Sequence, residues 1–451
     1  MGRKIQVCAL SLIAAFGYSA SAFAQATEPS TAKPAEATAG TTEPAAASAP
    51  ADVAPTPPPP PPPAPPPEPA PAAASPIAPD APPPTTFESL KIESKNGSAT
   101  LKLGLLLQPQ FETIGSGDAA QDGMSNNLFV RRTRFLVGGT LFKTFEYFFD
   151  TDTSNLFKGD TTTSSGAMPP TTGSGQKNGF GMNVLDAMVT WKAYEDMFKI
   201  DAGYMLTPGA HNALQGAGTL LGVDYFSNSF THSAAFNNAG GSPQGRDTGV
   251  EVRGLLLDNH IEYRAGLFQG LRKPGTATEA AAQNMFRFAG RIQINLLDAE
   301  TGFFYAGTYL GKKKILSVGG ALDMQSDYHH WAVDGFADLP LGPGTLTAQV
   351  NFSKWNGGGF TNPALAKQTA LMAEAGYRFD AFPIAPIAKF ELQDYGNSDR
   401  TNTRIGGGLA YFPYGHNVNL KAFYTNIKDK PNVGDSHSYN QLQLQLQLYF
   451  Y

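Results

Sequence analysis

The chain has 451 residues and a formal net charge of −5, a balance too weak to indicate a nucleic-acid partner. Charged residues make up 16% of the sequence, below the roughly 25% that is usual for soluble domains, whereas aromatic residues make up 11%. The mean hydropathy of −0.23 excludes a helical membrane protein. The apolar residues are therefore spread thinly and regularly along the chain.

Residues 1–24 have the layout of a secretory signal peptide. A basic start precedes an apolar stretch from Val7 to Phe16, and Ala22-Phe23-Ala24 offers a small-residue cleavage site. The apolar stretch is too short to cross a membrane. The one cysteine, Cys8, lies inside this segment, so the exported chain is expected to have neither disulfides nor thiol chemistry. Export without cysteine fits a bacterial envelope protein.

Residues 25–98 are predicted to form a disordered periplasmic arm. Thr27 to Thr86 consist largely of Ala, Pro, Thr and Ser, with an unbroken proline run from Pro57 to Pro63. This composition cannot bury a core and favours extended polyproline II or disorder. At about 3.1 Å per residue, about sixty residues would reach on the order of 150 to 190 Å. The arm is interpreted as a spacer, with a tether to peptidoglycan as the sharper alternative.

Residues 99–451 are predicted to form an all-β fold, a transmembrane antiparallel β-barrel. Apolar and polar residues alternate, as in Met285 to Leu296, where Phe288, Ile292 and Ile294 share one face. A soluble sandwich would also alternate, but its strands average about five or six residues. The runs here last about ten to twelve residues, the length that a tilted strand needs to cross a bilayer.

The connections between these runs are of two kinds. Short turns such as Asp258-Asn259 alternate with long stretches such as Thr153 to Gly181 and Thr207 to Gly245, a pattern typical of outer-membrane barrels. About sixteen strands are expected, and the even number places both ends of the barrel on the periplasmic side. Phe303 to Tyr309 is open between a strand and part of a turn. The expected strands begin near Leu101, Phe129, Phe145, Val184, Lys199, Asp247, Ile261, Phe286, Ile315, His330, Leu346, Thr369, Pro386, Thr403, Val418 and Tyr439.

Three segments of the predicted barrel carry a family pattern. Phe129 to Phe135 (FVRRTRF), followed by Gly138 and Leu141-Phe142-Lys143, resembles the first hairpin of the phosphate-selective porin O and P family. Phe198 to Ala210 and Gly245 to Val250 are similar to the strands before and after the third loop of that family. The resemblance implies a homotrimeric barrel of sixteen strands in the lipid of the bacterial outer membrane. It also implies an inward-folded third loop and a phosphate-type preference for anions.

If the apolar face of each strand meets lipid, the opposite face lines the lumen. The pore-lining residues predicted in this way are Arg132, Arg134, Arg253, Arg264, Arg287, Arg291, Glu251, Asp247, Glu146 and Asp150. Basic side chains lower the barrier for negative solutes, and the acids on the same face offset them. The constriction loop contributes one charge, Asp224. The residues therefore favour passive diffusion of small hydrophilic solutes or ions through a mixed-charge pore.

A structural role is the alternative for each arginine, which could brace the barrel wall in an ion pair. Arg253 lies two positions from Glu251 on one face of its strand, so the two could neutralise each other. Arg131 has outward parity and is expected at the outer rim of the barrel, where a charge near the interface is tolerated.

No catalytic constellation stands out in the sequence. The seven histidines are scattered, and the side chains of the adjacent pair His329-His330 would point to opposite faces of a strand. We therefore expect no enzyme activity, cofactor or metal. The alternative function is a structural envelope protein whose proline-rich arm anchors the outer membrane to the cell wall.

The segment Gln441 to Tyr451 (QLQLQLQLYFY) is expected to be the strand that closes the barrel. Its leucines and Phe450 would face lipid, and its glutamines would face water. Phe450 and Tyr451 are the predicted signal for the barrel assembly machinery, although Tyr451 falls on the glutamine face.

Overall fold

The computed structural model describes residues 89–116, 123–159, 177–227, 229–230, 245–271, 285–358, 365, 367–396 and 398–451. The predicted signal peptide and nearly all of the predicted arm lie outside the described residues. Among the described residues, no helix is both long enough and apolar enough to cross a membrane.

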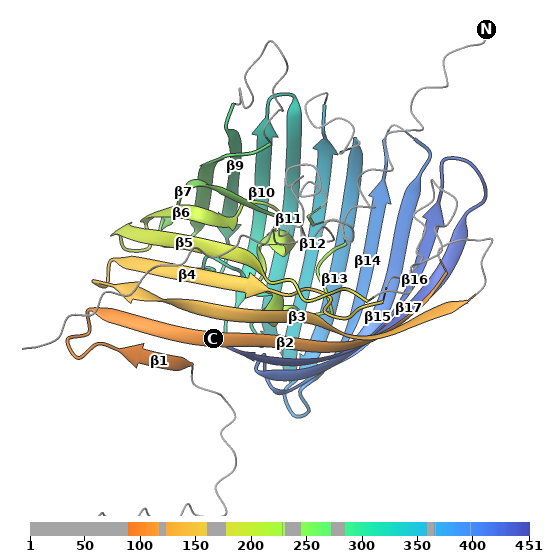
Figure 1. Cartoon of the computed structure of the whole chain (residues 1–451), viewed down its shortest axis with the longest axis horizontal. Helices are drawn as coiled ribbons and strands as arrows, with labels where there is room; N and C mark the ends of the chain where they lie inside the picture. The colour runs from red at the N-terminus through yellow and green to blue at the C-terminus, as the bar shows by residue number, and fades with distance from the viewer. Residues whose placement is uncertain are drawn as a thin grey trace, which may run out of the picture. The chain divides into compact units, whose positions relative to one another are not determined.

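The described chain is built almost entirely of β-strands (Figure 1). Two short 3-10 helices, η2 (His211–Leu214) and η3 (Ala217–Thr219), lie between β6 and β7. The strands are β1 (Leu90–Glu93), β2 (Ala99–Gly115), β3 (Met124–Leu141), β4 (Phe145–Asp152), β5 (Asn183–Tyr194), β6 (Phe198–Leu206), β7 (Arg246–Leu256), β8 (Ile261–Phe268), β9 (Arg287–Asn295), β10 (Ile315–Gln325), β11 (Tyr328–Leu341), β12 (Gly344–Asn356), β13 (Gln368–Phe379), β14 (Ile384–Asp394), β15 (Thr401–Tyr414), β16 (Val418–Lys430) and β17 (His437–Phe450).

Strands β2 to β17 form a closed antiparallel barrel. Each pairs with the next along the chain, and β17 returns to pair with β2, with Gln441 opposite Ile114 and Phe450 opposite Leu105. Closure gives every barrel strand two neighbours, which satisfies the backbone groups that a membrane cannot solvate. The predicted barrel of sixteen strands is confirmed. One start differs clearly, because β3 begins at Met124 rather than near Phe129.

The short strand β1 lies within the region predicted as arm. It pairs with β2, placing Leu90 opposite Leu103 and Glu93 opposite Thr100. The pairing of β17 with β2 ends at Leu105, on the same side of β2. Strand β1 therefore pairs with the part of β2 that extends beyond the end of β17. It covers backbone groups of β2 that would otherwise form an open edge.

The two faces of the barrel wall differ sharply in character. On β9, Ile292 and Ile294 are 61% and 50% exposed, whereas the inward Gln293 and Asn295 are both 0% exposed. Apolar side chains on the outside and polar ones on the inside reverse the arrangement of a soluble domain. This distribution is that of a transmembrane β-barrel, whose outer surface is covered by lipid.

Candidate functional site

The third loop, residues 207–245 between β6 and β7, folds into the barrel. In its described part, His211 and Leu214 are 0% exposed and Ala217 is 2% exposed. The loop is rich in small and apolar residues, and Asp224 is its one Asp, Glu, Lys or Arg. With so little charge to hydrate, the loop can be buried against the inner wall.

The connection between β9 and β10, residues 296–314, folds inward from the opposite end of the barrel. At that end the β7–β8 and β11–β12 turns span only residues 257–260 and 342–343. The N–H of Gly216 donates to the carbonyl of Tyr305 at 2.8 Å, and the N–H of Tyr305 donates to Leu214 at 2.9 Å. Two inward connections thus meet backbone to backbone. The segment that the sequence left open between strand and turn is this inner connection, not a barrel strand.

His211 lies at this meeting point. Its ring stacks on Tyr305 on one side and on Phe336 on the other, with centroid distances of 4.7 and 4.2 Å. Its Nε2 lies 2.9 Å from Oε2 of Glu300, and both side chains are 0% exposed. Burial alone would raise the pKa of Glu300, but His211 and the hydroxyl of Tyr309 outweigh it and lower that pKa. The carboxylate is therefore held in its charged form between the two connections.

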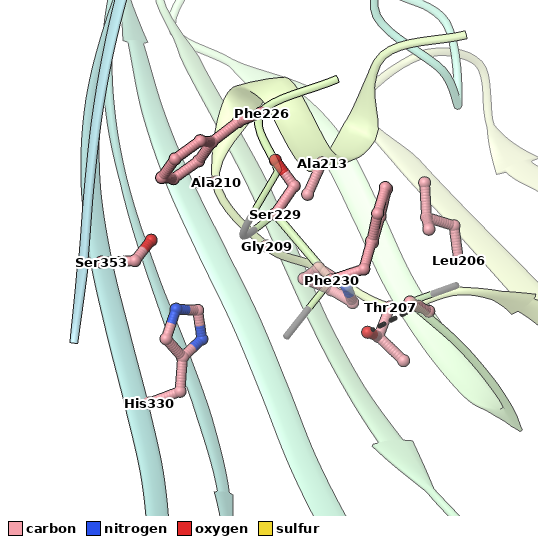
Figure 2. Close-up of a pocket in the computed structure, with 12 residues that line it drawn as sticks. Leu206, Thr207, Gly209, Ala210, Ala213, Phe226, Ser229, Phe230, His330 and Ser353 are labelled. Carbon is pink, nitrogen blue, oxygen red and sulfur yellow. Dashed lines mark hydrogen bonds between the residues drawn. The ribbon is translucent and has the colours of Figure 1, made fainter. Parts of the chain in front are cut away.

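Figure 2 shows the third loop against the barrel wall, where Phe226 and Ser229 lie near His330 of β11 and Ser353 of β12. The cavity there has a volume of about 10 Å³. That is room for about one water molecule at most. Phe226 also packs in a buried cluster with Trp355. The described part of the loop is therefore closely packed against β11 and β12 at this place.

The predicted constriction residue Asp224 bridges two adjacent arginines of β3. Its Oδ2 lies 2.8 Å from Nη2 of Arg131, and its Oδ1 lies 2.5 Å from Nη2 of Arg132. Asp224 remains 30% exposed and Arg131 16%, whereas Arg132 is 1% exposed. Burial alone would raise the pKa of Asp224, but Arg131 and Arg132 hold it well below its usual range.

The expected position of Arg131 at the outer rim is wrong, and a β-bulge is the reason. Leu107 of β2 pairs with Thr133, whereas Pro109 pairs with Val130, so β3 carries one extra residue in this interval. An extra residue interrupts the alternation of side chains. Both Arg131 and its neighbour in the sequence can therefore reach the third loop.

The predicted pore-lining arginines all lie on the inner face, and each is paired with a carboxylate. Four of them are almost fully buried among other side chains rather than in contact with water: Arg253 (6% exposed), Arg264 (2%), Arg287 (1%) and Arg291 (2%). Their closest acidic partners, with those of Arg134, are Arg134–Asp152 (3.3 Å), Arg253–Asp201 (2.6 Å), Arg264–Glu262 (2.7 Å), Arg287–Asp323 (2.6 Å) and Arg291–Asp334 (2.6 Å).

The predicted acids have varied surroundings. Asp150 lies 3.6 Å from Arg134, and Asp247 lies 3.2 Å from Arg287. Glu146 pairs with Lys192 at 2.9 Å, and its side chain is 40% exposed. Glu251 is 1% exposed, and neither of its carboxylate oxygens has a hydrogen-bond partner within the described part of the chain.

Arg253 does not pair with Glu251, although their spacing along the strand allowed it. Arg253 instead donates across the sheet to Asp201 of β6, from Nε to Oδ2 at 2.6 Å. Arg264 and Glu262 do pair along one strand at the same two-residue spacing. Spacing along a strand therefore does not predict which carboxylate an inward arginine selects.

The inner wall is more open near the end of the barrel where β16 joins β17. Inward side chains of β15, β16 and β17 are only half-buried there. They are Asn402, Arg404, Thr425, Gln441 and Gln443. They are mostly amides and hydroxyls, with a single basic group. This half-buried part of the inner wall is therefore polar and weakly charged.

The closing strand departs from the expected contact of its glutamines with water. Gln445 and Gln447 are 2% and 0% exposed and are held by hydrogen bonds to β2. The Phe450 backbone lies opposite Leu105, at the end of the pairing with β2. Tyr451 turns toward the glutamine face, as its parity predicts, and its ring lies 5.6 Å from that of Phe148. Whether these aromatics act as an assembly signal stays a prediction.

Among the described residues, no group of three or more His, Cys, Asp or Glu side chains could hold a metal ion. The sequence reasoning missed His211, Glu300 and the whole β9–β10 connection. The unusual length of residues 296–314 at an end with short turns was the available signal.

No protein-family model matches the sequence, and no curated protein matches it. The solved structures that are similar include OprB of Pseudomonas putida, at 10% identity and a TM-score of 0.51, covering 78% of this chain and 94% of that chain. OmpF of Salmonella typhi gives 14% identity and a TM-score of 0.49 over 80% and 100% of the two chains. The outer membrane channel DcaP of Acinetobacter baumannii gives 15% and 0.48 over 80% and 99%. The resemblance to the phosphate-selective family stays a prediction, and the similarity to OprB shows that the chain has a porin-type barrel fold.

Proposed function

We propose that the chain is an outer-membrane porin that passes small hydrophilic solutes or ions by passive diffusion. The observation that carries this proposal is the ion-paired loop inside a closed barrel. Asp224 projects from the third loop to Arg131 and Arg132 of the wall, and two of these three groups remain partly exposed. Opposite charges facing each other at a constriction admit polar solutes of either sign.

The charge preference of this channel is weak. The buried arginines of β7, β8 and β9 are neutralised by carboxylates and are largely shielded from the interior solvent. A strongly anion-selective pore needs basic groups that solutes can reach. The phosphate-type preference implied by the family resemblance therefore has little support from the described interior.

Single-channel recording in a planar lipid bilayer tests the proposal. Stepwise conductance is expected, together with a reversal potential close to zero across a salt gradient of a salt whose two ions are equally mobile. The absence of steps from folded, reconstituted protein would reject the channel. A large reversal potential of the anion-selective sign would reject the weak charge preference but not the channel.

The proposed location and partners follow from this function. An outer-membrane porin contacts lipid and depends on the barrel assembly machinery, and the family resemblance adds a homotrimer. Crosslinking of protein in native outer membranes would test the trimer. The predicted residues 1–24 would direct export, and cell fractionation tests that location.

The alternative function, a link to the cell wall, has one supporting observation. Strand β1 is hydrogen-bonded to β2, so residues 90–93, which the sequence assigned to the arm, are part of the barrel wall. A tether must transmit load to the barrel, and a paired strand can do so. Deletion of residues 27–86 should reduce co-sedimentation of the protein with peptidoglycan; unchanged co-sedimentation would reject the tether.

A further inference from the structure

The wall donors that meet the third loop come from strands far apart in the sequence. Gln108 of β2 donates to the carbonyl of Ala217 at 3.4 Å, and Gln447 of β17 donates to Gly218 at 2.8 Å. The Nζ of Lys421 on β16 donates to Leu220 at 2.6 Å and to Gly222 at 2.9 Å. The Nζ of Lys389 on β14 donates to Asp224 at 3.0 Å and to Tyr225 at 2.9 Å. Gln445 of β17 also donates to the carbonyl of Val223, at the longer distance of 3.5 Å. We call Gln108, Gln447, Lys421 and Lys389 the carbonyl clamp.

Three of the four clamp residues are buried, which makes their hydrogen bonds hard to replace with water, whereas the side chain of Lys389 is 11% exposed and also pairs with Glu391 at 2.9 Å. Gln108, Gln447 and Lys421 are 1%, 0% and 4% exposed. Lys421 forms no ion pair with a carboxylate in the described part of the chain, so its ammonium group relies on the two loop carbonyls. A buried charge that loses its partners is strongly disfavoured. The position of the loop and the charge of Lys421 therefore depend on each other.

The glutamines of β17 divide into two groups with different partners. Gln441 and Gln443 donate to Oε2 of Glu112 on β2, at 2.9 and 3.3 Å, and to no carbonyl in the described part of the loop. Gln447 donates both to the loop and to the carbonyl of His416. Within one run of alternating residues, one end therefore joins the barrel seam and the other end holds the loop.

The loop backbone lies close against the wall at the clamp. A Cβ atom placed on Gly218 would lie 2.9 Å from the ring of Tyr449, which is closer than such contacts allow. Leu221 and Val223 also pack in a buried cluster with Phe412 and Phe423 of the wall. The loop therefore has one defined position on this side of the barrel, and that position depends on the clamp donors.

We propose that the carbonyl clamp holds the third loop against the inner wall and thereby sets the open cross-section of the pore. Gln108, Gln447, Lys421 and Lys389 are positioning residues in this role, since they act on solutes through the loop rather than by contact. The inference rests on the proposed channel function. It extends that function by assigning the narrow state of the pore to side chains of the wall rather than to charges on the loop.

Single-channel conductance of Lys421→Met and Gln447→Met tests the clamp. Each variant should differ from the parent in single-channel conductance and show noisier open levels, because the loop loses a buried anchor and leaves its one defined position. Gln393→Met is the matched control, since it removes a buried inward amide of β14 that donates to Gln368 and to no carbonyl in the described part of the loop, and its conductance should equal that of the parent. Lys421→Arg keeps a charged donor and should stay close to the parent. Conductance equal to the parent in both Met variants would overturn the proposal.

A second readout does not require a conducting pore. Cys8 is the one cysteine of the sequence and lies in the predicted signal peptide, so a Leu220→Cys substitution adds a single reporter at a residue that is 2% exposed. Labelling by a charged thiol reagent should be about tenfold faster with Lys421→Met than with Gln393→Met, since losing one buried anchor shifts a local opening equilibrium by about that factor. Equal rates would overturn the clamp.

The two readouts separate failure of the clamp from failure of the channel. Faster labelling without conductance in any variant would support the clamp and reject the porin function. Conductance that is the same in all variants, with equal labelling, would support the porin function and reject the clamp. Heat-modifiable migration on a gel confirms that each variant is folded. If Lys421→Met does not fold, Lys389→Met and Gln447→Met carry the same test.

Discussion

Arg131 and Asp224 form an ion pair between the barrel wall and the third loop, with Nη2 and Oδ2 2.8 Å apart. The pair exists because the β-bulge in β3 turns Arg131 inward beside Arg132, which binds the other carboxylate oxygen. A loop carboxylate held by two guanidinium groups gives the constriction a net positive charge. That charge depends on a single acidic side chain.

Replacing Asp224 with Asn should shift the selectivity of the pore toward anions. The variant leaves two guanidinium groups without their carboxylate, so the constriction gains one positive charge. The loop should also become less firmly held, by about 1–3 kcal/mol, since a charge-assisted hydrogen bond is lost and one partner is buried. The reversal potential across a salt gradient measures the shift.

The control for that experiment is Asp380→Asn. Asp380 also pairs with an arginine, Arg378, but its side chain is 58% exposed and it lies in the β13–β14 turn. Its removal should leave the reversal potential unchanged. An equal shift in both variants would mean that net charge, rather than the position of Asp224, determines selectivity.

The charge of Asp224 should persist in mildly acidic solution. A carboxyl whose folded-state pKa is depressed stabilises the fold above its unfolded pKa, and the stabilisation is lost as the pH falls through the folded pKa. The pKa of Asp224 is held well below its usual range, so the pair should remain intact from about pH 7 to about pH 4.5. The difference in reversal potential between the parent and Asp224→Asn should therefore stay constant over this range.

Comparing the two proteins at each pH removes the effect of histidines and other groups that titrate in both. A difference that shrinks toward zero at about pH 4.5 would mean that Asp224 takes up a proton there, contrary to the ion-pair geometry.

Gly307→Val should separate the two inward connections. A Cβ atom at Gly307 would lie 2.7 Å from the Cα of Leu220, and backbone atoms cannot yield as a flexible side chain can. The variant should lower the midpoint of thermal unfolding, with an effect of about 1–3 kcal/mol that is typical of overpacking. Gly181→Val is the control, because a Cβ there meets no atom within 4 Å. Equal midpoints for the two variants would contradict the packing.

Removing Phe450 and Tyr451 should impair assembly more than it alters any pore that forms. Phe450 lies at the end of the pairing with β2, and Tyr451 packs against Phe148 near Lys102. The yield of folded barrel in outer membranes should fall while single-channel conductance stays the same. Removing Tyr451 alone separates the packing of its ring from the role of Phe450. Normal yield of the double truncation would reject the assembly signal.

Alternation of residues was sufficient to predict the barrel and its two faces. Side chains alternate strictly along a strand, so Ile292 and Gln293 had to lie on opposite sides whatever the rest of the chain did. The same rule placed Arg264 and Arg287 on the inner face correctly. It failed at Arg131, where one extra residue in β3 interrupts the alternation, and Pro109 of β2, at the same register shift, is a local sign of that bulge.

The destinations of the inward side chains were decided by the tertiary structure. The sequence of Gln441 to Tyr451 determined a strand with an amide face and an apolar face, because those properties depend only on local alternation. Whether an amide meets water, Glu112 or the carbonyl of Gly218 depends on what else occupies the lumen. That is decided by two connections folding in from opposite ends, and contacts between residues more than two hundred positions apart leave no pattern in a single strand.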